Sequence, residues 1–264
     1  MADGAAKPTD PVAAQMGGRG WALFPGQLTE RDLVAIGEDL ERIYRACRAV
    51  QLRNGVGGDM EGTAHHVLGY GGAIDRFVNH LPLYETIERH FGGKVIILNA
   101  GAVLNPPNAA AYTSRPHRDI RAFSPRYPLS LNMLVMLDDF TVENGATRLL
   151  PGSHLMPEMA SDTAFARDAV SVTGKAGDIV LFDSLVVHAA GPNRSESSRR
   201  ALTLCFGRPF MKPQMDWPRF LSAEAEAGLT GRGRQLLGYD ARVATSLDEY
   251  YQPPERWTFK ADQR

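Results

Sequence analysis

Apolar positions recur along this chain with two different periods, and the period changes near residue 94. Thr29 followed by Asp32 is typical of a capping box at a helix start. The apolar positions that follow have the spacing of an amphipathic helix: Leu33, Ile36, Leu40, Ile43 and Cys47. A second helix is predicted over residues 81–91. The first third of the chain is therefore expected to be mainly helical.

From residue 94 onward the pattern becomes one of short β-rich runs. Turns containing Gly, Pro and Asn separate these runs, which is typical of antiparallel strands. The predicted strands lie within residues 94–105, 128–137, 146–151, 177–183 and 200–210. They predict a mainly β fold, a sandwich or barrel, with helices in front of it.

The remaining segments lack a clear period. Residues 1–18 are rich in Ala, Gly and Pro, and we expect a flexible N-terminal segment there. Residues 53–76 are Gly-rich, which favours a loop that covers part of the molecule. We expect one domain over residues 19–264, with the β core at about 94–210 and a C-terminal extension of helices and loops over 211–264.

Composition narrows the class of partner. The formal net charge of −1 gives no electrostatic reason to expect nucleic acid or an anionic membrane as a partner. The only two cysteines, Cys47 and Cys205, lie in a predicted helix and a predicted strand, which favours a reducing compartment without disulfides. No leader-like segment or run of eighteen apolar residues is found. We expect a cytoplasmic monomer or homodimer that acts on a small molecule.

The segment SRPHRDIRAF contains the first candidate chemistry. On a strand, side chains at i and i+2 leave the same face, so His117 and Asp119 can converge while Arg118 faces away. With His188, which follows the strand at 177–183, they would complete the 2-His-1-carboxylate triad typical of non-haem Fe(II) oxygenases. Arg199 lies eleven residues later, and its guanidinium could bind the far carboxylate of a 2-oxo acid through two charge-assisted hydrogen bonds.

An ordered set of motifs resembles a known family. The set is His-x-Asp at 117–119, Asn-Gly-x5-Pro-Gly-Ser-His at 144–154, Gly-Asp-x3-Phe-Asp at 177–183, and then His188 with Arg199. It resembles the phytanoyl-CoA dioxygenase-like family of Fe(II)- and 2-oxoglutarate-dependent oxygenases. The likeness spans about residues 18–210.

The resemblance implies a double-stranded β-helix, a jelly roll of the cupin type. It implies His117, Asp119 and His188 as iron ligands and Arg199 as the anchor of the 2-oxoglutarate carboxylate. Thr147 matches a position where relatives offer a hydroxyl to the same co-substrate, and Asn132, on a strand expected to edge the cavity, is a further candidate for cofactor binding. The implied reaction consumes O2 and 2-oxoglutarate, releases succinate and CO2, and oxidises an unactivated C–H bond. Because related halogenases lack the carboxylate ligand, Asp119 favours hydroxylation or another oxidation.

Candidate substrate contacts are weaker inferences. Arg121 would share a strand face with His117 and Asp119, although a surface ion pair is an equally good interpretation. The other candidates are Tyr112 and Phe123 near these ligands, His65 in the Gly-rich loop, and Trp217 at the C-terminal side. A substrate such as an amino-acid-like compound or natural-product intermediate is expected. Two alternatives stay open: a cupin-like metalloenzyme that does not use 2-oxoglutarate, and a non-catalytic binding relative.

Overall fold

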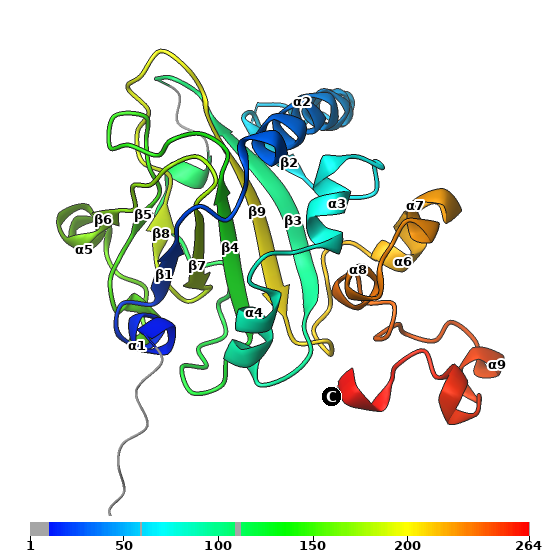
Figure 1. Ribbon diagram of the computed structural model, residues 1–264. Coiled ribbons are helices and arrows are strands. Elements are labelled where there is room, and N and C mark those ends of the chain that lie inside the picture. The colour runs from blue at the N-terminus through cyan, green and yellow to red at the C-terminus, as the bar shows by residue number, and fades with distance from the viewer. Residues whose placement is uncertain (1–10, 59, 109–111, 264) are drawn as a thin grey trace, which may run out of the picture.

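The computed structural model describes residues 11–58, 60–108 and 112–263, and its strands form two antiparallel sheets (Figure 1). The larger sheet has six strands in the order β1-β7-β4-β9-β3-β2, and the smaller has three in the order β6-β5-β8. The strands are β1 Trp21–Phe24, β2 Thr63–His65, β3 Ile96–Asn105, β4 Ser130–Met136, β5 Arg148–Leu149, β6 Val170–Ser171, β7 Ile179–Asp183, β8 His188–Ala189 and β9 Arg199–Gly207.

Helices cover one face of the six-stranded sheet (Figure 1). The longest, α2, begins after Thr29 with the predicted capping box, in which the Thr29 side chain accepts from the Asp32 amide. The α-helices are α1 Pro11–Gly18, α2 Glu30–Arg53, α3 Ala73–Asn79, α4 Tyr84–Phe91, α5 Asp162–Asp168, α6 Trp217–Phe220, α7 Ala223–Ala227, α8 Gly231–Leu236 and α9 Leu247–Tyr250. Short 3-10 helices are η1 Tyr112–Ser114, η2 Ser153–Leu155, η3 Pro254–Arg256 and η4 Ala261–Gln263.

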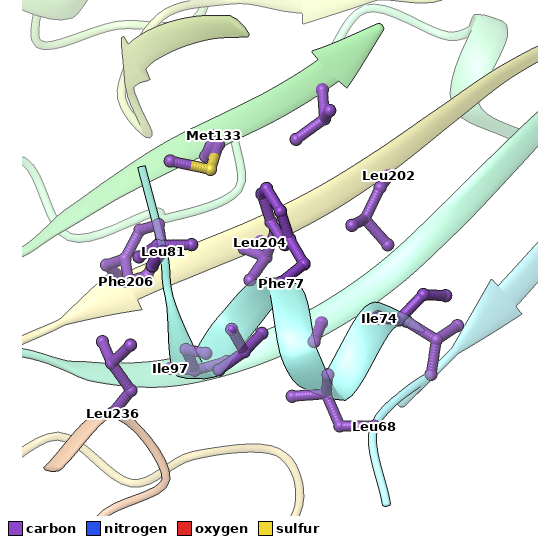
Figure 2. Close-up of a cluster of buried hydrophobic side chains, with 14 of the residues drawn as sticks. Leu68, Ile74, Phe77, Leu81, Ile97, Met133, Leu202, Leu204, Phe206 and Leu236 are labelled. Atoms are coloured by element: carbon purple, nitrogen blue, oxygen red, sulfur yellow. The ribbon is translucent and has the colours of Figure 1, made fainter. Parts of the chain in front are cut away.

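Side-chain alternation on the central strand β9 separates the core from the cavity side. Leu202, Leu204 and Phe206 are buried beneath the helices, where Phe77 of α3 packs over them (Figure 2). Burial of each such side chain contributes about 1.5–3 kcal/mol to folding. The alternate residues of β9 leave the opposite face, and those that line a cavity there are Arg199, Thr203 and Cys205. The same strand therefore supplies both the core and the candidate site.

The predicted jelly-roll fold, mainly β with flanking helices, is confirmed. The chain changes sheet repeatedly in its second half: β7 lies in the larger sheet, and after the turn at residues 184–187 the chain enters the smaller sheet as β8 and then returns to the larger sheet as β9. The two ends of this turn are joined by a hydrogen bond from the Val186 amide to the Asp183 carbonyl (2.9 Å). This change of sheet places His188 at the first residue of β8, between the sheets.

Two segments differ from the sequence predictions. Residues 11–18, expected to be flexible, form helix α1, because Val12 and Met16 lie one turn apart and pack together against the core. The predicted loop at residues 53–76 contains strand β2, which pairs with β3, and the start of α3. With three residues, β2 is too short to show alternation. The first ten residues lie outside the described ranges.

The C-terminal extension consists of short helices beside strand β3 (Figure 1). Trp217 attaches it to the core, since its indole Nε1 donates to the Ile97 carbonyl at 3.3 Å. None of the helices in the described ranges has both the length and the apolar character needed to cross a membrane.

Candidate active site

His117, Asp119 and His188 converge between the two sheets. One ligand atom from each lies within 4.8 Å of the others. The Nε2 atom of His117 is 3.5 Å from Asp119 Oδ1, and the Nε2 atom of His188 is 3.6 Å from Asp119 Oδ2. The structure therefore brings together the three residues that the sequence suggests as metal ligands.

Both imidazoles are oriented by the backbone. Nδ1 of His117 lies 2.8 Å from the Arg115 carbonyl, and Nδ1 of His188 lies 3.0 Å from the Val186 carbonyl. Because a carbonyl can only accept, each Nδ1 carries the proton and donates it. This tautomer leaves the Nε2 lone pair of each ring free to point at a shared position, as in protein metal sites.

The local chain path differs from the strand that the sequence predicts. Residues 116–119 are a loop with a single antiparallel bridge, in which the amides of His117 and His188 each donate to the other residue's carbonyl at 3.0 Å. Arg118 does face away from the metal ligands, and its guanidinium donates to the carbonyls of Ser153 (2.7 Å) and Met156 (2.9 Å). These bonds fix the loop that positions His117 and Asp119.

The electrostatics of the triad suit a cation. Burial acts to raise the pKa of Asp119, but the proximity of the His188 and His117 imidazoles and the hydrogen bond from Asn132 outweigh it and lower this pKa from 3.8 to about 2. Burial lowers the pKa of His188 below its usual value, so the ring is neutral at pH 7. The Asn132 amide donates to Asp119 Oδ2 at 2.7 Å and so fixes the carboxylate.

Arg199 is a buried cation on the same cavity. Its side chain is among the largest that are fully buried, and burial lowers its pKa from 12.5 to about 10. Nη2 donates to the Gly145 carbonyl (3.0 Å) and the guanidinium lies 4.2 Å from the centre of the Phe140 ring, but Nε has no hydrogen-bond partner among the described residues. The neighbouring Arg200 instead forms an ion pair with Asp138.

The turn at Gly145 explains how Arg199 is held. Gly145 has a φ of +79°, and a Cβ there would collide with the Gly191 carbonyl, so only glycine fits. Its carbonyl oxygen accepts from Arg199, and Thr147, two residues later, is buried and lines the cavity. The Asn-Gly pair in the sequence is the signal for this turn.

The cavity that contains these groups has a volume of about 380 Å³ and lies between the sheets. Its lining includes the three candidate metal ligands, Arg199, Thr147 and Asn132, and also His65 of β2. Polar residues that the sequence did not single out complete it on the β3 side: Asn99, Thr203, Lys212 and Gln214. Alternation along β3 could have identified Asn99, but nothing in the sequence indicates where the loop after β9 lies.

The other suggested substrate contacts lie elsewhere. Arg121 and Phe123 are exposed and do not line the cavity, because the chain bends after Asp119 instead of continuing as a strand. Trp217 is 1% exposed and packs in the core against His66, with ring centres 5.6 Å apart. The side chain of Tyr112 lies outside the described residues.

Comparison with known proteins gives a consistent result. A family model described as Phytanoyl-CoA dioxygenase (PhyH) matches residues 18–201. An uncharacterized protein of Mycobacterium tuberculosis is 41% identical over 147 residues, which cover 56% of this chain and 54% of the relative. The iron/alpha-ketoglutarate-dependent dioxygenase penM of Penicillium thymicola is 33% identical over 126 residues, or 44% of this chain and 39% of the relative. The matched part thus spans about half or less of these curated relatives.

The fold also has solved counterparts. The crystal structure of AviO1 from Streptomyces viridochromogenes Tue57 has a TM-score of 0.59 to this chain at 25% identity. The match covers 76% of this chain and 96% of AviO1. The similarity therefore extends over about three quarters of this chain.

Proposed function

Because the chain belongs to the phytanoyl-CoA dioxygenase family, we propose that it is a non-haem Fe(II)- and 2-oxoglutarate-dependent dioxygenase. One observation carries the proposal: a single cavity contains both a His-Asp-His cluster and a buried guanidinium without a carboxylate within 4 Å in the described part of the chain. The first arrangement fits a divalent metal and the second fits a dicarboxylic acid. The name of the penM relative, which gives both iron and alpha-ketoglutarate, supports the pairing.

The donor set fits iron. Two imidazole nitrogens and one carboxylate form the facial triad of non-haem Fe(II) oxygenases, which leaves positions open for other ligands. His117, Asp119 and His188 would hold the metal, and backbone hydrogen bonds to both Nδ1 atoms hold the rings in the required tautomer. Asn132, suggested by the sequence as a cofactor contact, would act by orienting the Asp119 carboxylate.

Arg199 and Thr147 fit the distal carboxylate of 2-oxoglutarate. Burying a cation costs free energy unless an anion pairs with it. Because Arg199 is already buried away from water, its charge-assisted hydrogen bonds to a bound carboxylate would be strong. Thr147 adds a hydroxyl on the same cavity wall, and Leu134 and Phe182 supply apolar surface that excludes water.

When bound, iron, 2-oxoglutarate and O2 supply the oxidising chemistry that converts a substrate C–H bond to C–OH with release of succinate and CO2. The protein's own residues bind, orient and desolvate these groups. The presence of Asp119 as a ligand supports hydroxylation or a related oxidation over halogenation. The cavity volume supports a small molecule as substrate, such as an amino-acid-like compound or a natural-product intermediate.

The test compares wild type with His117→Ala and His188→Ala. Wild type supplied with Fe(II), 2-oxoglutarate and O2 should form succinate, and should bind one Mn(II) in place of iron. Each His variant should lose the metal and the succinate. A wild type that binds metal but forms no succinate over a broad substrate panel, and does not bind 2-oxoglutarate, would support a cupin-like metalloenzyme. A protein that binds neither would support a non-catalytic binding relative.

A further inference from the structure

Lys212 differs from the other lysines in the described part of the chain. Lys94 is ion-paired with Glu88, Lys175 with Asp139 and Lys260 with Asp240. Lys212 is exposed and has no carboxylate within 4.0 Å among the described residues, yet it lines the cavity. An unpaired ammonium at the mouth of a substrate cavity is available to bind an anion.

The loop that carries Lys212 is fixed to the cavity wall. The Gln214 amide donates to the Leu98 carbonyl at 2.9 Å, and Asn99 Nδ2 donates to Gln214 Oε1 at 2.5 Å. Both bonds attach the loop to β3. In the larger sheet, β9 separates β3 from β4, the strand that carries Asn132. Lys212 therefore projects from a held segment and not from a free tail.

The cavity floor leads from the candidate metal ligands toward this loop. Asn132, Cys205 and Asn99 are register partners on β4, β9 and β3, so Asn99 lies two strand spacings, or about 10 Å, from Asn132. In the next row, Gly101 pairs with Thr203, and a Cβ at Gly101 would lie 2.9 Å from the Ala64 carbonyl oxygen, 3.4 Å from Thr203 Oγ1 and 3.6 Å from Asn99 Oδ1. A larger side chain at this position would therefore crowd the polar groups of Thr203 and Asn99.

The charges of the proposed catalytic centre cancel one another, so none of them balances the positive charge of Lys212. An iron(II) ion, the Asp119 carboxylate, a 2-oxoglutarate dianion and the Arg199 guanidinium together carry no net charge. No other side chain that lines the cavity in the described ranges is an acid. The ammonium of Lys212 is thus the one charge left for the substrate to match.

We propose that the substrate carries a carboxylate that binds Lys212, with polar groups that meet Thr203 and Asn99 on the way to the candidate metal ligands. The inference rests on the proposed function. It assigns Lys212 as a specificity-determining residue and restricts the substrate to anionic small molecules.

The experiment measures binding to protein loaded with Mn(II) and 2-oxoglutarate without O2. The probes are a panel of hydroxylated and ring-containing monocarboxylic acids, each paired with its primary amide, and binding is measured by calorimetry. Wild type should bind acids about tenfold or more tightly than the matching amides, since a charge-assisted hydrogen bond contributes about 1.5–3 kcal/mol. Lys212→Gln should remove this preference by weakening only the acids, and Lys212→Glu should reverse it. Lys175→Gln, a surface lysine away from the cavity, is the matched control and should behave as wild type.

Equal binding of acids and amides by wild type, or no binding of any acid, would overturn the inference. So would a Lys212→Gln variant that weakens acids and amides alike, because this would indicate a structural role. A separate titration of the same proteins with 2-oxoglutarate distinguishes the two proposals. If wild type binds 2-oxoglutarate but shows no acid preference, only the role of Lys212 fails; if 2-oxoglutarate does not bind, the proposed function itself fails.

Discussion

Replacement of Arg199 by Met should remove tight binding of 2-oxoglutarate while leaving the unliganded fold about as stable as before. Arg199 is 2% exposed, and in the part of the chain that the structure describes its guanidinium forms no ion pair within 4 Å; the carboxylate that acts on its charge, Asp138, is paired with Arg200. Burying an unpaired charge costs folding free energy, and Met fills a similar volume without this cost. The variant loses the hydrogen bond to Gly145, which contributes about 1 kcal/mol. These opposing effects should keep the melting temperature within about 4 °C of wild type.

The effect on binding should be much larger. In the complex, the guanidinium would donate two charge-assisted hydrogen bonds to the distal carboxylate, each contributing about 1.5–3 kcal/mol. At the lower end, the loss of both costs about 3 kcal/mol, which weakens binding about 100-fold. Arg199→Lys retains the charge without the planar pair of donors and should have an intermediate affinity.

Calorimetric titration of Mn(II)-loaded protein with 2-oxoglutarate measures the loss of affinity, and thermal unfolding of metal-free protein measures the change in stability. The reasoning would be refuted by an Arg199→Met variant that binds 2-oxoglutarate as wild type does. It would also be refuted by a metal-free variant that loses more than about 3 kcal/mol of stability, since Arg199 would then serve the fold rather than the co-substrate.

Three further predictions follow from single contacts. Asn132→Ala frees the Asp119 carboxylate and should weaken Mn(II) binding about 10- to 100-fold in a metal titration; unchanged affinity would exclude the orienting role. Burial raises the pKa of the Cys205 thiol to about 12, so that its thiolate fraction at pH 8 is about 10⁻⁴. Iodoacetamide should therefore label Cys205 at least about 1000-fold more slowly in folded than in urea-unfolded protein, as followed by peptide mass spectrometry, and rapid labelling of folded protein would contradict the raised pKa of this thiol on the cavity wall. Thr29→Ala removes the capping box of α2 and should cost about 1 kcal/mol, lowering the melting temperature by about 2–4 °C without altering 2-oxoglutarate affinity.

Sequence patterns predict the parts of the fold that depend on interactions between residues close together in the chain. The capping box at Thr29 and the alternation along β9 both act within a few residues, and both appear in the structure. The opposite orientations of Arg199 and Arg200 follow from the same alternation. Strand β2 was missed because its pairing partner, not its own three residues, determines its conformation.

The candidate site shows a similar division. His117 and Asp119 are brought together by a loop that Arg118 and a bridge to His188 hold in place, so the prediction of a strand gave the right convergence from a wrong local structure. For the same reason, extending that strand to Arg121 misplaced this residue. Lys212 could not be found from the sequence, because its position depends on a loop fixed to β3.

The mutual backbone hydrogen bonds between His117 and His188 have a consequence for metal exchange. They tether two distant parts of the chain by main-chain atoms alone, so the spacing of the two imidazoles is established during folding. A divalent ion that binds after folding therefore pays little conformational entropy to bring the two imidazoles together. When the ion dissociates, the two segments stay joined. Repeated stripping and reloading, with iron or with a spectroscopic substitute such as cobalt, should therefore be possible without refolding the protein.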